Sequence, residues 1–326
     1  MTRLPLTICL ALTWFFAVNT LVSVAVAAAS KWYSTRGARR GETAMDRQLA
    51  LAWRLLPAGL SSAVVAVFVP AFLAYEPSGS PEPVGWTLRL TAGATLALVA
   101  AGCGRGAMLT RRARSIVDRL QVDAVPLELP GLSGTRIRAY AVHDAFPVVS
   151  LVGVWRPRLF VARQVLAVLS ATELKAAVEH ELAHSRAWDN ATRVLYAWTP
   201  DLLGWLPAGR RLERLWAAAA EREADRTAAQ GSATRGVDLA GALVKVSRLA
   251  AAPASAPAVP LFSTFHECGE IADRVRRLVS ASSGEPRCCS GLPARGVAAA
   301  LVVCASVPKM WQMLHAISET CVQFLP

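Results

Sequence analysis

Three long apolar runs in the first third of the chain constrain the fold more than any other feature. They cover residues 6–29, 55–75 and 84–103, and each contains about 20 residues or more. An α-helix needs about 20 apolar residues to cross the hydrocarbon core of a bilayer. Tryptophan and tyrosine side chains stand near the ends of the runs, as is typical of membrane interfaces. We therefore expect a membrane domain over residues 1–110 with three transmembrane helices.

The composition excludes an ordinary soluble enzyme. Of the 326 residues, 54% are hydrophobic and only 18% are charged, whereas soluble globular proteins carry roughly 25% charged residues. The formal net charge is +12, but much of the basic excess borders the apolar runs. No direct nucleic-acid binding is therefore expected, and the first expected partner is the lipid bilayer.

The charges beside the apolar runs predict how they cross the membrane. Residues 30–54 hold six basic side chains and residues 104–119 hold five, whereas residues 76–83 hold two acidic side chains and no basic one. Basic loops favour the cytoplasmic side of a membrane. We therefore expect a multi-pass protein of the cell membrane with its N-terminus outside and residues 104–290 in the cytoplasm.

Two segments leave alternatives open. The first run ends in AVAAAS, which also fits the cleavage site of a signal peptide. Residues 291–308 form a weaker apolar run with Arg295 and Lys309 near its two ends. This run can span a membrane only if both basic side chains extend to the lipid headgroups. Residues 291–326 are therefore a candidate fourth transmembrane helix with a short tail.

A metal-binding motif lies in the predicted cytoplasmic part. Residues 173–190 read ELKAAVEHELAHSRAWDN, in which His180 to His184 fit the pattern H-E-x-x-H. On a helix, residues four apart share one face, so both imidazoles can bind one Zn²⁺ at about 2.0–2.1 Å. Ser170 offers a cap for that helix. Glu181 can take a proton from water on the metal and return it to the leaving amine, which makes it the candidate catalytic base.

A catalytic zinc needs a third protein ligand, and the best candidate lies about 40 residues further on. Residues 217–229, AAAAEREADRTAA, are helical by composition, with Glu221 and Asp225 on one face. We expect Glu221 to bind the metal and Asp225 to accept the N–H of a ligand histidine, His180 in particular. Glu223 is a lesser candidate ligand because it lies off that face. The alternative for this segment is a solvated helix face with local ion pairs.

The combination of HELAH, Asp189 nine residues after His180, and EREADR resembles the integral-membrane gluzincin metallopeptidases. Two families are similar: the beta-lactam sensor-transducer peptidases, and the group of CAAX prenyl endopeptidases and heat-shock membrane proteases. The similarity covers residues 145–230 and the membrane layout. Within it, residues 146–170, FPVVSLVGVWRPRLFVARQVLAVLS, resemble the edge strand and the segment before the zinc helix.

Three N-terminal spans, a cytoplasmic zinc domain and a fourth span resemble the sensor-transducer family most. Only residues 310–326 would follow the fourth span, so no extracellular sensor domain is expected and no beta-lactam sensing. The resemblance implies a mostly helical α+β zincin-like domain over residues 111–290, with one Zn²⁺ per chain. In zincins the edge strand, here Pro147–Gly153, pairs with an extended substrate. The alternative is an ordinary core strand.

Further residues have two interpretations each. Asp189 can support the metal site, or it can end the zinc helix with Asn190 as the cap of the next helix. The segment LFSTFHECGEIADRVRRL resembles one in the prenyl-protease group in which a histidine and an arginine face the substrate. His266, a second candidate catalytic residue, and Arg274 or Arg277 could therefore stabilise a transition state. The alternative is a surface histidine beside a basic helix face.

These features predict a membrane-bound zinc-dependent endopeptidase that cleaves cytosolic or membrane-associated proteins. The sensor-transducer resemblance implies regulated cleavage of a partner such as a transcriptional repressor. A second role is housekeeping quality control of membrane proteins. A different class of function is a signalling or scaffolding membrane protein that keeps zinc for structure, although a structural site has no use for the carboxylate of Glu181. A third is a membrane-anchored nucleic-acid-binding protein.

Overall fold

The three apolar runs form the three longest helices of the described chain, α1 (Arg3–Arg40), α2 (Arg47–Tyr75) and α3 (Trp86–Val122). By length and composition, all three are candidate membrane spans. The predicted set of three spanning helices is confirmed at this level, and their orientation stays a prediction. Each helix is longer than its apolar run.

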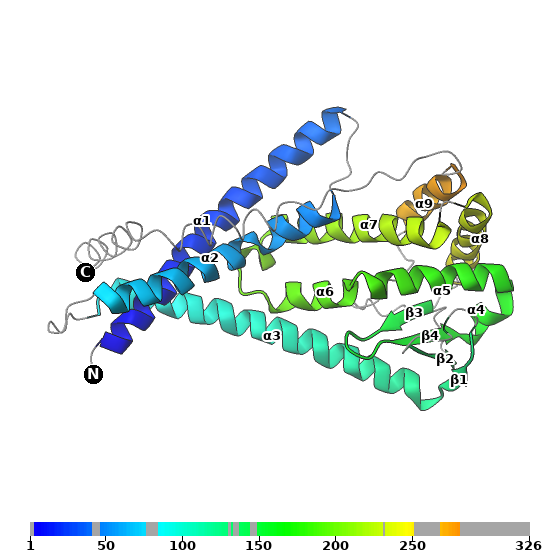
Figure 1. The fold of residues 1–326 in the computed structure, drawn as a ribbon, viewed down its shortest axis with the longest axis horizontal. Helices are drawn as coiled ribbons and strands as arrows, with labels where there is room; N and C mark the ends of the chain where they lie inside the picture. The colour runs from blue at the N-terminus through cyan, green and yellow to red at the C-terminus, as the bar shows by residue number, and fades with distance from the viewer. Residues whose placement is uncertain are drawn as a thin grey trace. The chain divides into compact units, whose positions relative to one another are not determined.

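The computed structural model describes residues 3–40, 46–75, 84–129, 132, 137–143, 149–230, 232–250 and 268–280. The described part is mostly helical and contains one small sheet (Figure 1). The candidate fourth span and His266 lie outside these residues. After α3 the elements are β1 (Val125–Leu127), β2 (Arg138–Val142), β3 (Val149–Val152), β4 (Arg158–Ala162), α4 (Arg163–Val168), α5 (Ala171–Arg186), α6 (Asp189–Trp198), the 3₁₀ helix η1 (Leu202–Gly204), α7 (Pro207–Ala229), α8 (Ala233–Ala250) and α9 (Cys268–Ser280).

The chain divides into two compact units. The first contains residues 1–105 and 196–217, and the second contains residues 106–195 and 218–288. The predicted boundary at residue 110 therefore falls close to the end of the first unit. Residues 196–217, which the sequence analysis assigned to the cytoplasmic domain, belong to the same unit as the apolar helices.

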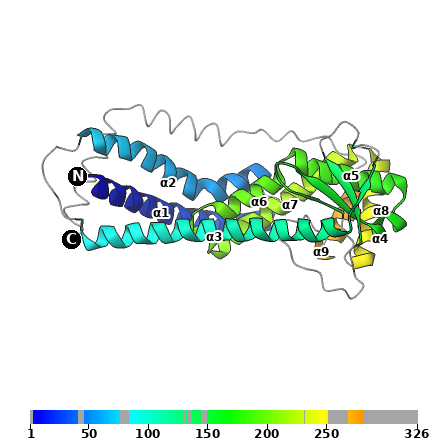
Figure 2. The same cartoon turned by 90° about the horizontal axis from the view of Figure 1, so that it is seen from below.

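In the first unit, α1 packs beside α2 and α3 (Figure 2). Aromatic rings fill the contact between α1 and α2, where Trp14 meets Phe68 with 6.0 Å between ring centroids. Between α1 and α3, the hydroxyls of Thr13 and Thr91 are hydrogen-bonded at 2.7 Å. Hydrogen bonds between small polar side chains hold apolar helices together in lipid, because the hydrophobic effect does not favour helix association there.

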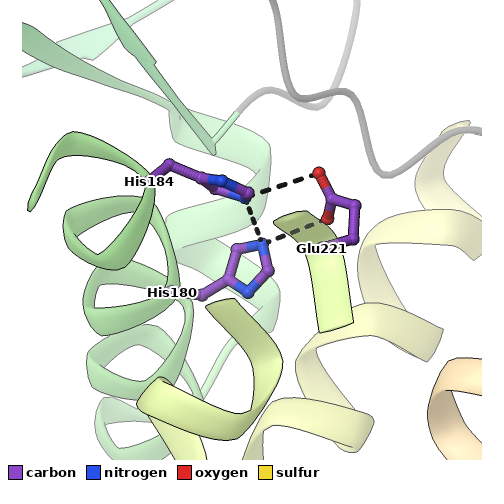
Figure 3. Close-up of side chains that lie close together, drawn as sticks. All are labelled: His180, His184 and Glu221. Atoms are coloured by element: carbon purple, nitrogen blue, oxygen red, sulfur yellow. Dashed lines mark hydrogen bonds and ion pairs between the residues drawn. The ribbon is translucent and has the colours of Figure 1, made fainter. Parts of the chain in front are cut away.

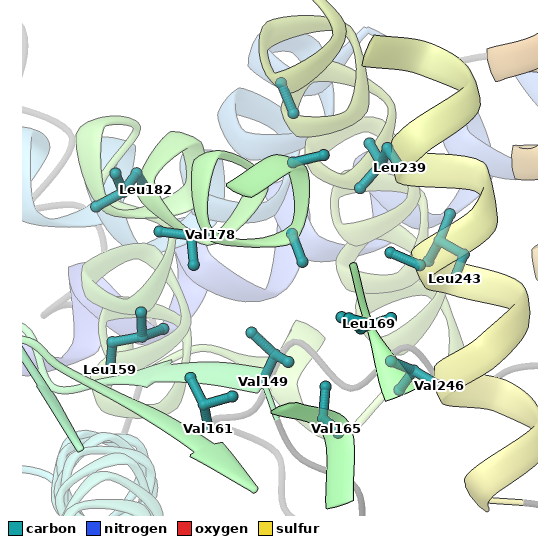
Figure 4. Close-up of a cluster of buried hydrophobic side chains, with 14 of the residues drawn as sticks. Val149, Leu159, Val161, Val165, Leu169, Val178, Leu182, Leu239, Leu243 and Val246 are labelled. Atoms are coloured by element: carbon teal, nitrogen blue, oxygen red, sulfur yellow. The ribbon is translucent and has the colours of Figure 1, made fainter. Parts of the chain in front are cut away.

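In the second unit, a four-stranded sheet has the order β1-β2-β4-β3. β2 and β4 are parallel, and the two outer pairs are antiparallel. The sheet packs against α5 and α8 through a cluster of buried aliphatic side chains (Figure 4). Its labelled members include Val149, Leu159, Val161, Val165, Leu169, Val178, Leu182, Leu239, Leu243 and Val246. β3 lies at one edge of the sheet, and all four of its residues are buried. This core fixes α5 against the edge strand.

Candidate metal centre

α5 carries the H-E-x-x-H motif and begins where the sequence predicts. Ser170 is its N-cap: the Ser170 hydroxyl accepts the N–H of Glu173 at 3.2 Å, and the Glu173 carboxylate accepts the N–H of Ser170 at 2.7 Å. This reciprocal capping box satisfies two backbone donors at the helix start. The motif lies in the later turns of α5, where His180, Glu181 and His184 are all buried.

α7 supplies the third member of the group. Its alanine-rich second half favours helix and permits close packing. Glu221 lies on this half, with a side chain that is 18% exposed, and Asp225 follows one turn later. The predicted helix over 217–229 is confirmed, because α7 continues to Ala229.

His180, His184 and Glu221 converge on one point (Figure 3). The two Nε2 atoms lie 3.1 Å apart. Oε2 of Glu221 lies 3.4 Å from Nε2 of His180, and Oε1 of Glu221 lies 3.4 Å from Nε2 of His184. Ligand atoms around a tetrahedral ion at about 2.0–2.1 Å stand about 3.3 Å apart. The spacing of the three side chains therefore fits three corners of a tetrahedral metal site, and a fourth position would be left for water or substrate.

The outer nitrogens of both rings face carboxylates. Oδ2 of Asp189 lies 2.7 Å from Nδ1 of His184, and Oδ1 of Asp225 lies 3.1 Å from Nδ1 of His180. Because an ionised carboxylate only accepts hydrogen bonds, we assign the ring proton to Nδ1 in both histidines. When both rings are neutral, each directs a lone pair from Nε2 toward the Glu221 carboxylate. Such a convergence of lone pairs needs a positive charge, which protons or a metal ion can supply.

The pKa values of the cluster agree with this requirement. Burial by itself lowers the pKa of His184, but hydrogen bonds to Asp189 and Glu221 raise it to about 10. Burial likewise opposes protonation of His180, and Asp225 and Glu221 raise its pKa. Burial disfavours the Glu221 carboxylate, yet both histidines hold its pKa well below the usual value. Without a metal, protons supply the positive charge, so a metal that binds here must displace them.

Glu181, the predicted base, is fully buried beside these ligands. Its Oε2 accepts the N–H of Leu151 in the edge strand β3 at 3.0 Å. Burial raises the pKa of Glu181 above that of an ordinary carboxyl group. A raised carboxyl pKa brings a group closer to the range in which it can both accept and return a proton near neutrality.

Arg274 of α9 has a role that the sequence analysis missed. Its Nε and Nη2 donate to Asp225 at 2.9 and 2.6 Å, and its Nη1 lies 3.1 Å from Glu221. The side chain is only 6% exposed. Arg274 therefore connects the third ligand to the carboxylate that faces His180. A role of Arg274 as a transition-state donor stays a prediction, and in this structure its guanidinium contacts two acidic side chains.

The other candidates are placed as follows. Asp189 lies within hydrogen-bond distance of His184, and its support of a metal site stays a prediction. Asn190 is not a helix cap: it is the second residue of α6, and its side-chain amide donates to the Leu151 and Gly153 carbonyls. Glu223 is exposed and is not a member of the metal-binding group. Arg277 is also exposed, and its Nε donates to a backbone carbonyl in its own helix.

No protein-family model matches this chain, and no curated protein is significantly similar to it in sequence.

Proposed function

We propose that this protein is a membrane-bound zinc-dependent endopeptidase. The observation that carries the proposal is the convergence of His180, His184 and Glu221 within 4.8 Å, with Glu181 next to the first histidine. Two imidazoles and one carboxylate are a ligand set that suits zinc and leaves an open position. The three candidate membrane spans support attachment to the bilayer.

Each residue of the site has a task under this proposal. His180, His184 and Glu221 hold the metal, and Asp189 and Asp225 fix the orientation of the two rings. When bound, zinc supplies Lewis-acid chemistry, which polarises a carbonyl and makes water more acidic. Glu181 takes the proton from the attacking water and returns it to the leaving amine.

The edge strand β3 supports a peptide as the substrate. The Leu151 N–H donates to Glu181, and the Leu151 carbonyl accepts from Asn190. Both backbone groups therefore face away from β4, toward the motif helix. To pair with the strand at this edge, an extended peptide would have to replace the Glu181 and Asn190 side chains as the partners of Leu151. Its scissile carbonyl would then lie beside Glu181.

The substrates we propose are cytosolic or membrane-associated proteins, because a site tethered to the bilayer meets these first. The resemblance to the sensor-transducer peptidases favours regulated cleavage of a partner such as a transcriptional repressor. Housekeeping proteolysis of membrane proteins is the alternative role.

One observation favours a second candidate, a non-catalytic zinc-binding membrane protein. The hydrogen bond from Leu151 gives Glu181 a structural task as well. In that case the carboxylate would join α5 to the sheet edge without moving a proton. The two candidates differ in whether the charge of Glu181 is needed for turnover.

The test compares Glu181→Gln with Glu179→Gln in full-length protein in detergent, with unfolded casein as substrate. Both residues lie on α5, but Glu179 pairs with the exposed Arg186 and not with the site. The peptidase proposal expects cleavage by the wild type and Glu179→Gln, abolished by a chelator, restored by zinc, and lost in Glu181→Gln. Cleavage by Glu181→Gln at the wild-type rate would contradict it. Equal zinc content in all three proteins without cleavage by any would favour the second candidate.

A further inference from the structure

The segment between α6 and α7 shows an unusual pattern of hydrogen bonding in the first unit. Residues 199–206 contain only the short turn η1 and leave several backbone groups without helical partners. Side chains from the apolar helices meet these groups. Asn19 of α1 donates to the Pro200 carbonyl at 3.4 Å and accepts the N–H of Leu202 at 3.2 Å.

The other two apolar helices contribute in the same way. Arg105 of α3 donates to the Thr199 carbonyl at 2.9 Å. Arg54 of α2 donates to the Tyr196 carbonyl at 3.4 Å. Polar side chains of α1 and α3 therefore meet the backbone of this segment, and Arg54 of α2 meets the last turn of α6 just before it.

Backbone groups inside a bilayer require protein partners of this kind. Non-helical backbone at membrane depth is tolerated only where protein groups satisfy its polar atoms, since no water is present to do so. Asn19 is fully buried and stands near the middle of the candidate span Leu4–Thr35. A side-chain amide in an otherwise apolar run is costly unless it forms hydrogen bonds with polar protein groups such as these.

The charges of the segment are also neutralised internally. Asp201 is fully buried and lies 2.5 Å from Nη1 of Arg54, which is itself only 1% exposed. Glu213 of α7 lies 2.7 Å from the Nε of the same arginine. Oδ1 of Asp201 accepts the N–H of Gly204 at 2.8 Å. The carboxylate thus carries both a counter-ion and a backbone donor, as a charged group removed from water requires.

The exposed side of the segment has the side chains of a membrane interface. Trp198 and Trp205 are 43% and 58% exposed, and Arg210 and Arg214 are exposed on the first turns of α7. Tryptophan rings favour the headgroup level of a bilayer, and nearby arginines can reach lipid phosphates.

We propose that residues 198–207 form a re-entrant segment that enters the leaflet at the Arg54 and Arg105 ends of the spans. Its surface partner is the lipid bilayer, with Trp198 and Trp205 at the level of the headgroups and acyl chains. With the predicted orientation of the spans, this is the cytoplasmic leaflet. The proposal does not depend on peptidase activity, because every contact that supports it lies in the first unit.

The test is spin-label accessibility in the full-length protein. A nitroxide at Trp205→Cys, in a variant whose seven native cysteines are replaced, is compared with labels at Leu90→Cys and Val237→Cys. Leu90 is an exposed residue of α3, and Val237 is an exposed residue of α8. The protein is placed in vesicles of phosphatidylethanolamine and phosphatidylglycerol. Oxygen, which concentrates in acyl chains, and a nickel chelate, which stays in water, are the two relaxing agents.

The expected result is a ratio of oxygen to nickel collisions at residue 205 that is severalfold higher than at 237 and close to that at 90. A label at Pro207→Cys gives a second reading from the same turn. Nickel accessibility at both positions equal to that at 237 would overturn the proposal. Shielding from both agents would also overturn it, in favour of a protein partner on this surface.

A substitution in α1 tests whether Asn19 holds the segment in the bilayer. Asn19→Leu removes the partner of Pro200 and Leu202, and it should increase nickel accessibility at residue 205. Ser23→Ala is the matched control, because Ser23 is also buried on α1 and the segment does not use it. An equal response to both substitutions would show that Asn19 does not hold the segment in the bilayer.

Discussion

Arg274 and Asp225 form a buried ion pair with two hydrogen bonds, from Nε to Oδ2 at 2.9 Å and from Nη2 to Oδ1 at 2.6 Å. The side chains are 6% and 9% exposed. The same Oδ1 lies 3.1 Å from Nδ1 of His180. The orientation of His180, a proposed metal ligand, therefore depends on an arginine that lies 49 residues beyond Asp225 in the chain.

Replacing Arg274 should destabilise the site more than replacing any other basic residue of α9. Arg274→Met leaves the Asp225 charge buried without its cation, and breaking a buried pair in this way costs about 3–5 kcal/mol. We expect a large loss of thermal stability and weaker metal binding, measured on purified protein in detergent. Arg276→Gln is the control, because Arg276 is 75% exposed and loses only a surface pair with Asp273. Equal effects of the two substitutions would contradict the positioning role.

Asp189 should control metal affinity without changing the fold. Asp189→Asn keeps the shape of the side chain but loses the charge that faces His184. Removing a hydrogen-bond partner of a ligand histidine reduces metal affinity by about 10–100-fold. Competition for zinc against a chelator of known affinity measures the change. Asp273→Asn, at a 63% exposed position outside the site, should leave the affinity unchanged, and a loss equal to that of Asp189→Asn would contradict this account.

The start of the motif helix should make stability depend on pH. Partial burial opposes ionisation of Glu173, but hydrogen bonds from Lys245 and Ser170 lower its pKa below the ordinary value of 4.5. A lowered carboxyl pKa stabilises the fold above the unfolded pKa, and this contribution is lost as the pH falls through the folded pKa. Wild type should therefore exceed Glu173→Gln in stability by a constant amount at neutral pH. The difference should shrink below about pH 4.5.

The free energy of unfolding of wild type and Glu173→Gln, measured across the acid pH range, tests this pH dependence. Glu179→Gln is the control on the same helix, since its pair with Arg186 is at the surface and contributes about 0–1 kcal/mol. If the stability difference between wild type and Glu173→Gln grew toward low pH, it would contradict a lowered pKa of Glu173 in the folded protein.

Replacement by alanine at two glycines of α3 should change the stability of the protein in opposite directions. A Cβ at Gly102 would lie 3.0 Å from the Trp198 carbonyl oxygen and 3.3 Å from Cα of Pro200, whereas a Cβ at Gly104 meets nothing within 4 Å. Gly102→Ala should destabilise by about 1–3 kcal/mol, because two backbones must move apart. Gly104→Ala should stabilise by about 0.5–1 kcal/mol, because alanine favours the helix. Thermal unfolding in detergent measures both, and shifts in the same direction would contradict the close approach.

Local features of the site could be predicted from the sequence. The capping residue Ser170, the shared face of His180 and His184, and the helix around Glu221 follow from spacings of three or four residues. The same spacing rule led to the expectation that Asp225 would face His180, and these two side chains do meet.

Pairings between distant segments could not be predicted in this way. Arg274, Arg276 and Arg277 look alike in the sequence, and only the packing of α9 decides that the first is buried. The placement of residues 196–217 with the apolar helices depends on Asn19 and Arg54, which are 142–183 residues away in sequence. The mixed composition of that segment carries no sign of these partners.

The proposed function rests on one zinc ion bound by His180, His184 and Glu221. X-ray absorption spectroscopy of the purified full-length protein tests this binding, together with metal content in the wild type and His184→Ala. We predict one zinc per chain, bound by nitrogen and oxygen at about 2.0–2.1 Å with no sulfur ligand, and loss of that zinc in His184→Ala. A folded wild-type protein without zinc after reconstitution, or zinc bound by thiolate at about 2.3 Å, would contradict the claim.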